Sequence, residues 1–207
     1  MNPPKTILAF DTSAAHCAAA LLCNGQITSH FEPMQKGQAE RLIPMLEQIL
    51  AGAGIGWPDL DALAVGTGPG NFTGVRIGVA AARGLALGLG IPAIGVTRLE
   101  ALAHGLPRPI TVIEDARRDA VYVQSFDDAA QTARLADLES LGQVYPCQTG
   151  SAASPEAIPA AMPLAEAILR IAATRFSETS HHPRPAPFYL RGADAAPPSD
   201  PPPVILP

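Results

Sequence analysis

The most informative stretch of the sequence reads Gly66-Thr67-Gly68-Pro69-Gly70-Asn71-Phe72 and separates two apolar segments. Before it, Leu60 to Val65 predicts a short buried strand, and after it Thr73 to Leu89 predicts a long apolar helix. Glycine-rich loops at the start of a helix can hold phosphate on their backbone N–H groups. This loop lacks the pattern G-x-x-x-x-G-K-S/T and does not match G-x-G-x-x-G, so the two commonest nucleotide-binding patterns are absent.

Small residues recur at every fourth position from this loop into the helix, at Gly70, Gly74, Gly78, Ala82, Ala86 and Gly90. Positions four apart lie on one side of a helix, so such a stripe lets another helix approach closely. Each glycine lowers helix stability by about 1 kcal/mol relative to alanine, a cost that close packing has to offset. We interpret the stripe as a seam between subunits, with packing inside this chain as the alternative.

The segment before the loop predicts three strands and a helix. Residues 6–10, 16–23 and 26–31 have strand character, and Asn24-Gly25 between the last two favours a type I′ hairpin. Apolar residues then follow at helical spacing, and Gly52 and Gly54 end the pattern. These apolar positions are Leu42, Ile43, Leu46, Ile49 and Leu50.

The segment after the long helix predicts a second lobe. Residues 92–96 predict a strand and 98–104 a short helix, and two strands, 110–114 and 120–126, turn at Arg117-Arg118-Asp119. Residues 127–160 show little periodicity, whereas the apolar spacing after them predicts a last helix over residues 162–176. We therefore expect a first lobe over residues 1–108 and a smaller second lobe over residues 109–182.

The last part of the chain, residues 183–207, is a proline-rich tail. It holds nine of the 22 prolines, and a segment so rich in proline can neither continue a helix nor donate sheet hydrogen bonds. Phe188-Tyr189-Leu190-Arg191 interrupts it with aromatic and aliphatic side chains, and we expect this cluster to dock back on the protein.

Composition limits the possible partners. Of the 207 residues 47% are hydrophobic and 16% charged, and 14 Lys+Arg against 19 Asp+Glu give a net charge of −5. Nucleic acids are bound mainly through Lys and Arg, yet only Lys5 and Lys36 are lysines and the arginines form no stripe. The apolar stretch from 73 to 96 contains Arg76 and Arg83, which makes it a poor membrane span. We expect a cytoplasmic protein that does not bind RNA alone.

Candidate chemical groups are few. Cys17, Cys23 and Cys147 show no zinc or disulfide spacing, the five histidines match no metal motif, and no metal site is expected. Asp11-Thr12-Ser13 ends the first strand and could face a nucleotide phosphate, but capping of the following turn is the favoured interpretation. Glu114-Asp115-Ala116-Arg117 is either a polar functional corner or a charged solvated turn.

Four segments together resemble one family, the bacterial TsaB (YeaZ) proteins of tRNA threonylcarbamoyladenosine biosynthesis. The segments are Ile7 to Ser13, Gly68-Pro69-Gly70-Asn71-Phe72-Thr73-Gly74-Val75-Arg76-Ile77-Gly78, Asp115-Ala116-Arg117 and Tyr189-Leu190-Arg191. The resemblance is good over residues 5–126 and returns in the tail. It implies an α/β fold of the two-lobed actin-like and sugar-kinase-like (ASKHA) type, with mixed sheets flanked by helices.

The resemblance also implies a function. The chain is expected to be a non-catalytic subunit that pairs with TsaD, and with TsaE in a larger complex, to modify the adenosine beside the anticodon of tRNA. It would have no cofactor of its own, ATP or ADP would bind only in the complex, and tRNA would be contacted only indirectly. The expected partner interface comprises Gly70, Phe72, Thr73, Gly74, Arg76, Ile77, Gly78, Ala82, Leu42 and Leu46, and the weaker nucleotide candidates are Asp11, Thr12 and Ser13.

The chain departs from the family pattern at two places. Gly37-Gln38 stands where relatives have His-Ser, and Asn71 stands where they have Ser, so an acid–base group and a hydroxyl are missing.

The alternative function is an enzyme of the same fold, either an ATP-dependent phosphotransferase or a peptidase. A homodimer that uses the same seam is the third possibility.

Overall fold

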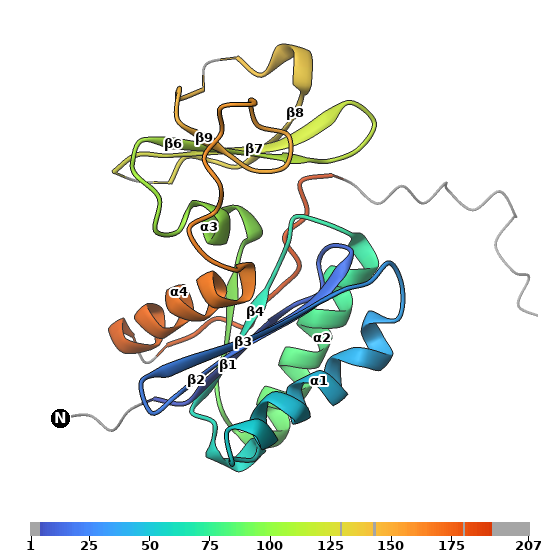
Figure 1. The fold of residues 1–207 in the computed structure, drawn as a ribbon, viewed down its shortest axis with the longest axis vertical. Helices are drawn as coiled ribbons and strands as arrows, with labels where there is room; N and C mark the ends of the chain where they lie inside the picture. Colours follow the sequence, from blue (N-terminus) through green and yellow to red (C-terminus); the bar gives the residue numbers. More distant parts are fainter. Residues whose placement is uncertain (1–4, 129, 143, 180, 192–207) are drawn as a thin grey trace, which may run out of the picture.

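The computed structural model describes residues 5–128, 130–142, 144–179 and 181–191, and these form two α/β lobes placed one above the other (Figure 1). The first lobe is built on a five-stranded sheet with strand order β3-β2-β1-β4-β5. Its strands are β1 (Ile7–Asp11), β2 (His16–Cys23), β3 (Gln26–Pro33), β4 (Ala62–Gly66) and β5 (Ala93–Val96). β1, β2 and β3 pair antiparallel, while β4 and β5 continue the sheet parallel to β1, so the sheet is mixed.

The hairpin between β2 and β3 confirms the expected turn chemistry. Asn24 and Gly25 have φ angles of 51° and 78°, both in the left-handed region that a type I′ turn requires. This two-residue turn fixes the register in which Cys23 faces Gln26, and His16 faces Pro33 at the other end. The register places His16 beside the end of β1, where the candidate site lies.

Helices cover both faces of this sheet, so its central strands are buried on both sides. On one face α1 (Gln38–Gly52) and α2 (Phe72–Leu89) pack over Leu8 and Phe10 of β1. On the other face α4 (Leu164–Glu178) packs over Ile7 and Ala9. A short 3-10 helix, Trp57–Asp59, precedes β4. The alternation of side chains along β1 therefore fills two separate cores.

The second lobe is a smaller, four-stranded mixed sheet with strand order β8-β7-β6-β9. The strands are β6 (Ile110–Asp115), β7 (Ala120–Phe126), β8 (Arg134–Asp137) and β9 (Gln148–Thr149), with a 3-10 helix at Leu138–Ser140. β6 and β7 confirm the two predicted strands. The short strands β8 and β9 carry no clear period-2 pattern, which explains why the sequence alone did not reveal them.

The boundary of the second lobe differs from the expected residue 182. α4 forms as predicted, but it packs on β1, β2 and β4 of the first sheet and on α3 (Arg98–Ala103), with its apolar residues in the first lobe's second core. The chain therefore visits the second lobe between β6 and β9 and then returns. Helical periodicity identifies the apolar face of α4 but does not say which sheet that face covers.

After α4 the chain runs back across the first lobe toward the second. The Phe188 amide donates a hydrogen bond of 2.8 Å to the Thr67 carbonyl, so the predicted aromatic cluster does contact the glycine-rich loop. The remaining prediction for the tail, from residue 192 onward, lies outside the described residues. The described part brings Tyr189 to the start of α2, beside the candidate site.

Candidate functional site

Asp11, at the end of β1, is the centre of a buried polar cluster. Its Oδ1 accepts hydrogen bonds from the Ser13 amide at 3.0 Å and the Ser13 hydroxyl at 2.9 Å, and it lies 2.8 Å from His16 Nε2. Asp11 and Ser13 are fully buried, and His16 is 7% exposed. The bonds from Ser13 are those of a capped turn, so the capping interpretation of Asp11-Thr12-Ser13 is confirmed.

The cluster keeps Asp11 ionised. Burial raises the pKa of its carboxyl, but the hydrogen bond and charge of His16, the charge of Arg98 and the Ser13 amide together outweigh burial. The pKa of Asp11 therefore lies below its ordinary value of 3.8. The sequence did not reveal the role of His16, because the contact depends on the hairpin register that brings β2 back along β1.

The glycine-rich loop packs directly against this turn. A Cβ on Gly70 would overlap the Ser13 carbonyl, and a Cβ on Gly74 would overlap the Thr12 carbonyl. The Asn71 amide donates to the Ser13 carbonyl at 2.6 Å, and the Thr12 hydroxyl donates to the Gly74 carbonyl at 2.7 Å. The glycines at the start of α2 are thus required by contacts inside the chain.

The start of α2 leaves little capacity for a phosphate. Asn71 is the N-cap residue of α2, and its Oδ1 accepts from the Gly74 amide at 3.0 Å, so it performs the capping role that serine would have. The Asn71 amide donates to the Ser13 carbonyl, so two of the amides around the start of α2, those of Asn71 and Gly74, are already bonded to the chain's own groups and are not free for an anion. The loop and the Asp11 turn therefore fit a structural function better than a nucleotide site.

The same turn fits a metal ion poorly. Asp11 Oδ2 is buried without a hydrogen-bond partner among the described residues, but the Gly66 backbone packs so closely that a Cβ there would overlap this oxygen. No group of three or more His, Cys, Asp or Glu side chains arranged to hold a metal occurs in the described part of the chain. The packing leaves no room at Oδ2 for an ion and its other ligands.

The structure divides the expected partner interface into a buried set and an exposed set. Leu42, Leu46, Gly74, Gly78 and Ala82 are buried inside this chain, so they offer no surface to a partner. Gly70, Phe72, Thr73 and Arg76 are exposed, and Ile77 is half-buried. The period-four stripe is therefore an internal contact at its first half, and packing inside the chain is the interpretation that the structure supports there.

The exposed face of α2 carries a different set of small and apolar residues. Gly84 and Gly88 face open space, Leu87 is 80% exposed, and Phe72 is 38% exposed. The other exposed or half-buried residues along this face are Thr73, Ile77, Ala80 and Ala81. Within the described residues, α2 is the one helix whose length and hydropathy would suit a membrane span, and a third of it is buried in the fold. Its opposite side packs on β4, and Arg76 and Arg83 interrupt the apolar surface.

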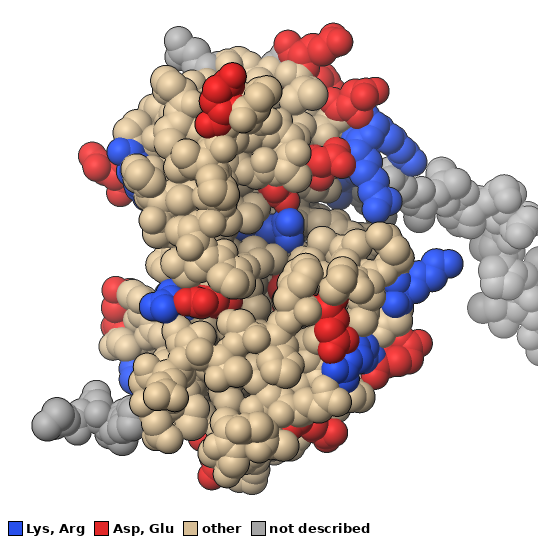
Figure 2. Space-filling model, viewed as in Figure 1, with Lys and Arg blue, Asp and Glu red and all other residues tan. Residues whose placement is uncertain are grey.

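The start of α2 is completed by the returning tail. Tyr189 stacks on Phe72 with ring centroids 4.9 Å apart, and Arg76 Nε donates to the Tyr189 hydroxyl at 3.2 Å. The Arg76 guanidinium also lies 4.0 Å from the centroid of the Phe72 ring. These three side chains form an exposed cluster at the start of α2. Figure 2 shows that several Lys and Arg side chains gather on one side of the molecule, near the level where the two lobes meet.

The polar corner at the end of β6 joins the two lobes. Glu114 accepts a 2.7 Å hydrogen bond from Arg98 Nε of α3 with one oxygen and a 2.7 Å bond from the Ser151 amide with the other. The neighbouring residues Arg117, Arg118 and Asp119 all have φ between 53° and 63°, a left-handed turn in which the Arg117 amide donates to Asp115 Oδ1. Glu114 is thus a structural link, a role that the solvated-turn interpretation did not foresee.

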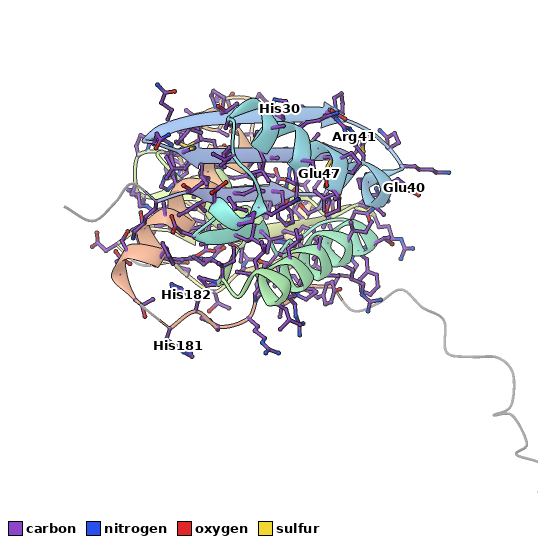
Figure 3. The ribbon with its side chains drawn as sticks, turned by 90° about the horizontal axis from the view of Figure 1, so that it is seen from below. His30, Glu40, Arg41, Glu47, His181 and His182 are labelled. Atoms are coloured by element: carbon purple, nitrogen blue, oxygen red, sulfur yellow. The ribbon has the colours of Figure 1, made fainter. Side chains whose placement is uncertain are left out.

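The remaining histidines and cysteines assemble no site in the described residues. Figure 3 shows His181 and His182 well away from His30 and from Glu40, Arg41 and Glu47. Arg41 is engaged by Glu32, with its Nε 2.7 Å from Oε2. All three cysteines are free, and burial raises the pKa of the Cys17 thiol to about 11, so this thiol is held in its unreactive form.

Comparisons with known proteins agree with this fold. A family model described as "TsaD: tRNA N6-adenosine threonylcarbamoyltransferase" matches residues 32–178. The Escherichia coli K12 "tRNA threonylcarbamoyladenosine biosynthesis protein TsaB" is 43% identical over 121 residues, which are 56% of this chain and 52% of that protein. An uncharacterised protein of Mycobacterium tuberculosis H37Rv is 34% identical over 201 residues, 93% of this chain and 95% of that protein. The structure of YeaZ from Pseudomonas aeruginosa aligns with a TM-score of 0.77 at 30% identity, covering 90% of this chain and all of that one.

The two mixed sheets, the helices that flank them and the TsaD-type match define an α/β protein of the actin-like, sugar-kinase-like class. Within that class the chain belongs to the TsaB (YeaZ) family. The resemblance of the four sequence segments is thereby confirmed. The aligned region spans about half the length of the curated TsaB relatives from Escherichia coli and Haemophilus influenzae.

Proposed function

We propose that this chain is a non-catalytic subunit of the complex that transfers threonylcarbamoyl to the adenosine beside the anticodon of tRNA. The proposal is supported by the names of its TsaB relatives, which are tRNA threonylcarbamoyladenosine biosynthesis proteins. The observation that carries it is the exposed apolar face of α2, which has the small residues and the unpaired surface that a docking helix needs. Its partner in this proposal is a TsaD-class protein of the same fold.

Charge distribution supports a partner with the same two-helix layout. α1 presents Glu40 and Glu47 to solvent (Figure 3), while α2 presents Arg76 and Arg83. A partner related by a two-fold or pseudo-two-fold axis places its α2 against α1 of this chain, so that acidic and basic residues meet. A TsaD-class partner gives a heterodimer with this arrangement, whereas a second copy of the chain gives a homodimer.

The polar cluster around Asp11 has a supporting role in this proposal. Its hydrogen bonds hold the turn on which the glycine-rich loop and the start of α2 rest. In the complex, ATP or ADP binds to surfaces that the partners TsaD and TsaE help to form, and tRNA is contacted through TsaD. With a net charge of −5 and two lysines, the chain has little electrostatic attraction for RNA and works in the cytoplasm beside the enzyme that binds it.

The partner interface is tested by one bulky substitution on the exposed face of α2. Gly84→Leu fills space that is open in this chain, so it should keep or slightly raise the melting temperature, because leucine favours a helix more than glycine by about 0.8 kcal/mol. In a closely packed interface the same side chain costs about 1–3 kcal/mol, which weakens the heterodimer about 5- to 150-fold. The measurement is the dissociation constant with purified TsaD-class protein.

The matched control is Thr174→Leu, which adds the same side chain at an exposed position of α4 on the opposite face of the sheet. It should leave the dissociation constant unchanged. Equal binding by wild type and Gly84→Leu would show that this face of α2 is not the interface. A homodimer with no affinity for the TsaD-class protein would favour the third possibility raised by the sequence.

A further inference from the structure

Residues Pro185–Arg191, called the strap below, lie across both lobes. On the first lobe, Pro185 is buried against Gly95, where a Cβ would lie 3.2 Å from the Pro185 Cβ. The Phe188 amide bonds to the Thr67 carbonyl at 2.8 Å, and the Phe188 carbonyl lies close to Gly68, 3.3 Å from the position of a Cβ there. This end of the strap is thus seated on β5 and on the glycine-rich loop that precedes α2.

The other end of the strap is held by the second lobe. Leu190 packs against the core that α3 shares with β6 and β7, which includes Leu99, Ile110 and Tyr122. Arg191 Nη2 donates to the Arg117 carbonyl at 3.2 Å, within the left-handed turn at the end of β6. A single residue, Leu190, therefore separates the contact with α2, at Tyr189, from the contact with the second-lobe turn, at Arg191.

The strap is held mainly by side chains. Among the described residues, the strap makes one backbone-to-backbone hydrogen bond, which the Phe188 amide donates. Pro185 and Pro187 have no amide hydrogen to donate. Tyr189 contributes its hydroxyl and its ring to α2 while 42% of its surface stays exposed. Segments with few backbone hydrogen bonds and much exposed surface open at low free-energy cost, so the strap can be seated or released.

We infer that the strap couples the docking face of α2 to the position of the second lobe, with Tyr189 as the positioning residue. A partner that covers the start of α2 contacts the exposed Phe72–Tyr189–Arg76 cluster and stabilises the seated strap. The seated strap then holds Leu190 and Arg191 on the second lobe. This inference rests on the proposed function, because it needs a partner on α2. The first of the two experiments that test it requires only the isolated chain.

The experiment measures amide hydrogen exchange at Ala116 and Ala120, whose amides bond across the turn to Ala120 O and Arg117 O. In the isolated chain, Tyr189→Ala should speed exchange at these amides about tenfold and leave β1 and β2 unchanged. Tyr189→Phe, which keeps the stack on Phe72 and loses the hydroxyl, should give a smaller increase. Phe31→Ala, which removes an exposed aromatic ring from β3, is the control and should have no effect at the turn.

The second arm adds TsaD-class protein at a saturating concentration. Wild type should show slower exchange at Ala116 and Ala120, and Tyr189→Ala should not respond although it is fully bound. If exchange at the turn is unchanged in isolated Tyr189→Ala, the strap does not hold the second lobe. If wild type and Tyr189→Ala respond equally to the partner, the strap does not couple the α2 face to the second lobe. If wild type does not bind the partner, the proposed function fails, while the first arm still decides whether the strap holds the second lobe.

Discussion

At the scale of single residues, Asp11 shows how a position typical of a nucleotide site can serve the fold. A carboxylate at the end of the first strand, followed by two hydroxyl residues, is compatible with either role in sequence. The structure distinguishes them, because the Ser13 amide, the Ser13 hydroxyl and His16 all meet Asp11 Oδ1, and Gly66 closes the space beside Oδ2. Asp11 holds together the turn on which the start of α2 rests.

Asp11→Asn should lower the stability of the folded protein without altering its shape. The variant weakens a buried, charge-assisted cluster, so we expect a loss of about 1–3 kcal/mol in the free energy of unfolding at pH 7, measured by urea denaturation. Asp59→Asn, at an exposed carboxylate of the 3-10 helix before β4, is a control that should cost less. A change no larger than that of the control would contradict the role assigned to Asp11.

The same residue predicts a pH dependence. The pKa of Asp11 is lower in the folded protein than its ordinary value of 3.8, so its charge stabilises the fold above about pH 4. That contribution is lost as the pH falls through the lower, folded-state pKa. The difference in stability between wild type and Asp11→Asn should therefore shrink when unfolding is measured at successively lower pH below 4. A difference that stays constant over that range would argue against an ionised Asp11 in the fold.

At the scale of secondary-structure elements, the sequence predicts where α2 begins and ends but not which of its sides faces inward. Its limits, its apolar character and its small-residue stripe are local properties and were predicted within a residue or two. Which side of the helix faces inward depends on the turn at Thr12-Ser13, 60 residues earlier in sequence. The stripe at Gly70, Gly74 and Gly78 therefore faces the chain itself, while Gly84 and Gly88 face outward.

The two kinds of glycine in α2 should respond oppositely to the same substitution. Gly74→Ala places a methyl group on the Thr12 carbonyl, which cannot move without disturbing the buried turn, so stability should fall by about 1–3 kcal/mol. Gly84→Ala adds a methyl group in open space and should raise stability by about 0.5–1 kcal/mol. Thermal denaturation of both variants checks this, and a stable Gly74→Ala protein would contradict the described packing.

The same distinction applies to the other elements. The Asn24-Gly25 hairpin and β1 to β3 follow from local turn chemistry and strand composition, so the sequence predicts them well. β8 and β9 and the return of α4 to the first sheet depend on contacts between distant segments. The candidate site was only half predictable for the same reason, because Asp11 and Ser13 are neighbours in sequence while His16 and Gly66 approach them only through the sheet.

At the scale of the whole molecule, the lobes are joined through α3, which packs on α4 and on β6, and also by the strap and the Arg98–Glu114 pair. The pair is largely buried, with side-chain exposures of 18% and 8%, and Glu114 also accepts from the Ser151 amide. Removing one charge from such a pair leaves the other poorly compensated. Glu114 therefore matters to the assembly of the molecule more than to any reaction.

Glu114→Gln should loosen the second lobe relative to the first. The amide keeps an acceptor for the Ser151 amide but loses the charge that faces Arg98, so we expect a loss of about 1–3 kcal/mol in stability. Limited proteolysis should cut the second lobe earlier than in wild type, while β1 and β2 stay protected. Glu139→Gln, at a carboxylate in the 3-10 helix of the second lobe, provides the control. Equal cleavage rates in wild type and Glu114→Gln would contradict this link.

We propose that the chain supports tRNA modification through the outer face of α2. The most direct measurement is the yield of threonylcarbamoyladenosine on tRNA in a reaction with TsaD, TsaE, ATP and a threonylcarbamoyl donor. We predict that wild type and Thr174→Leu raise the yield strongly, while Gly84→Leu, although folded, leaves it near the level without this chain. The claim is contradicted if the yield without this chain equals that with it, or if Gly84→Leu is as active as wild type.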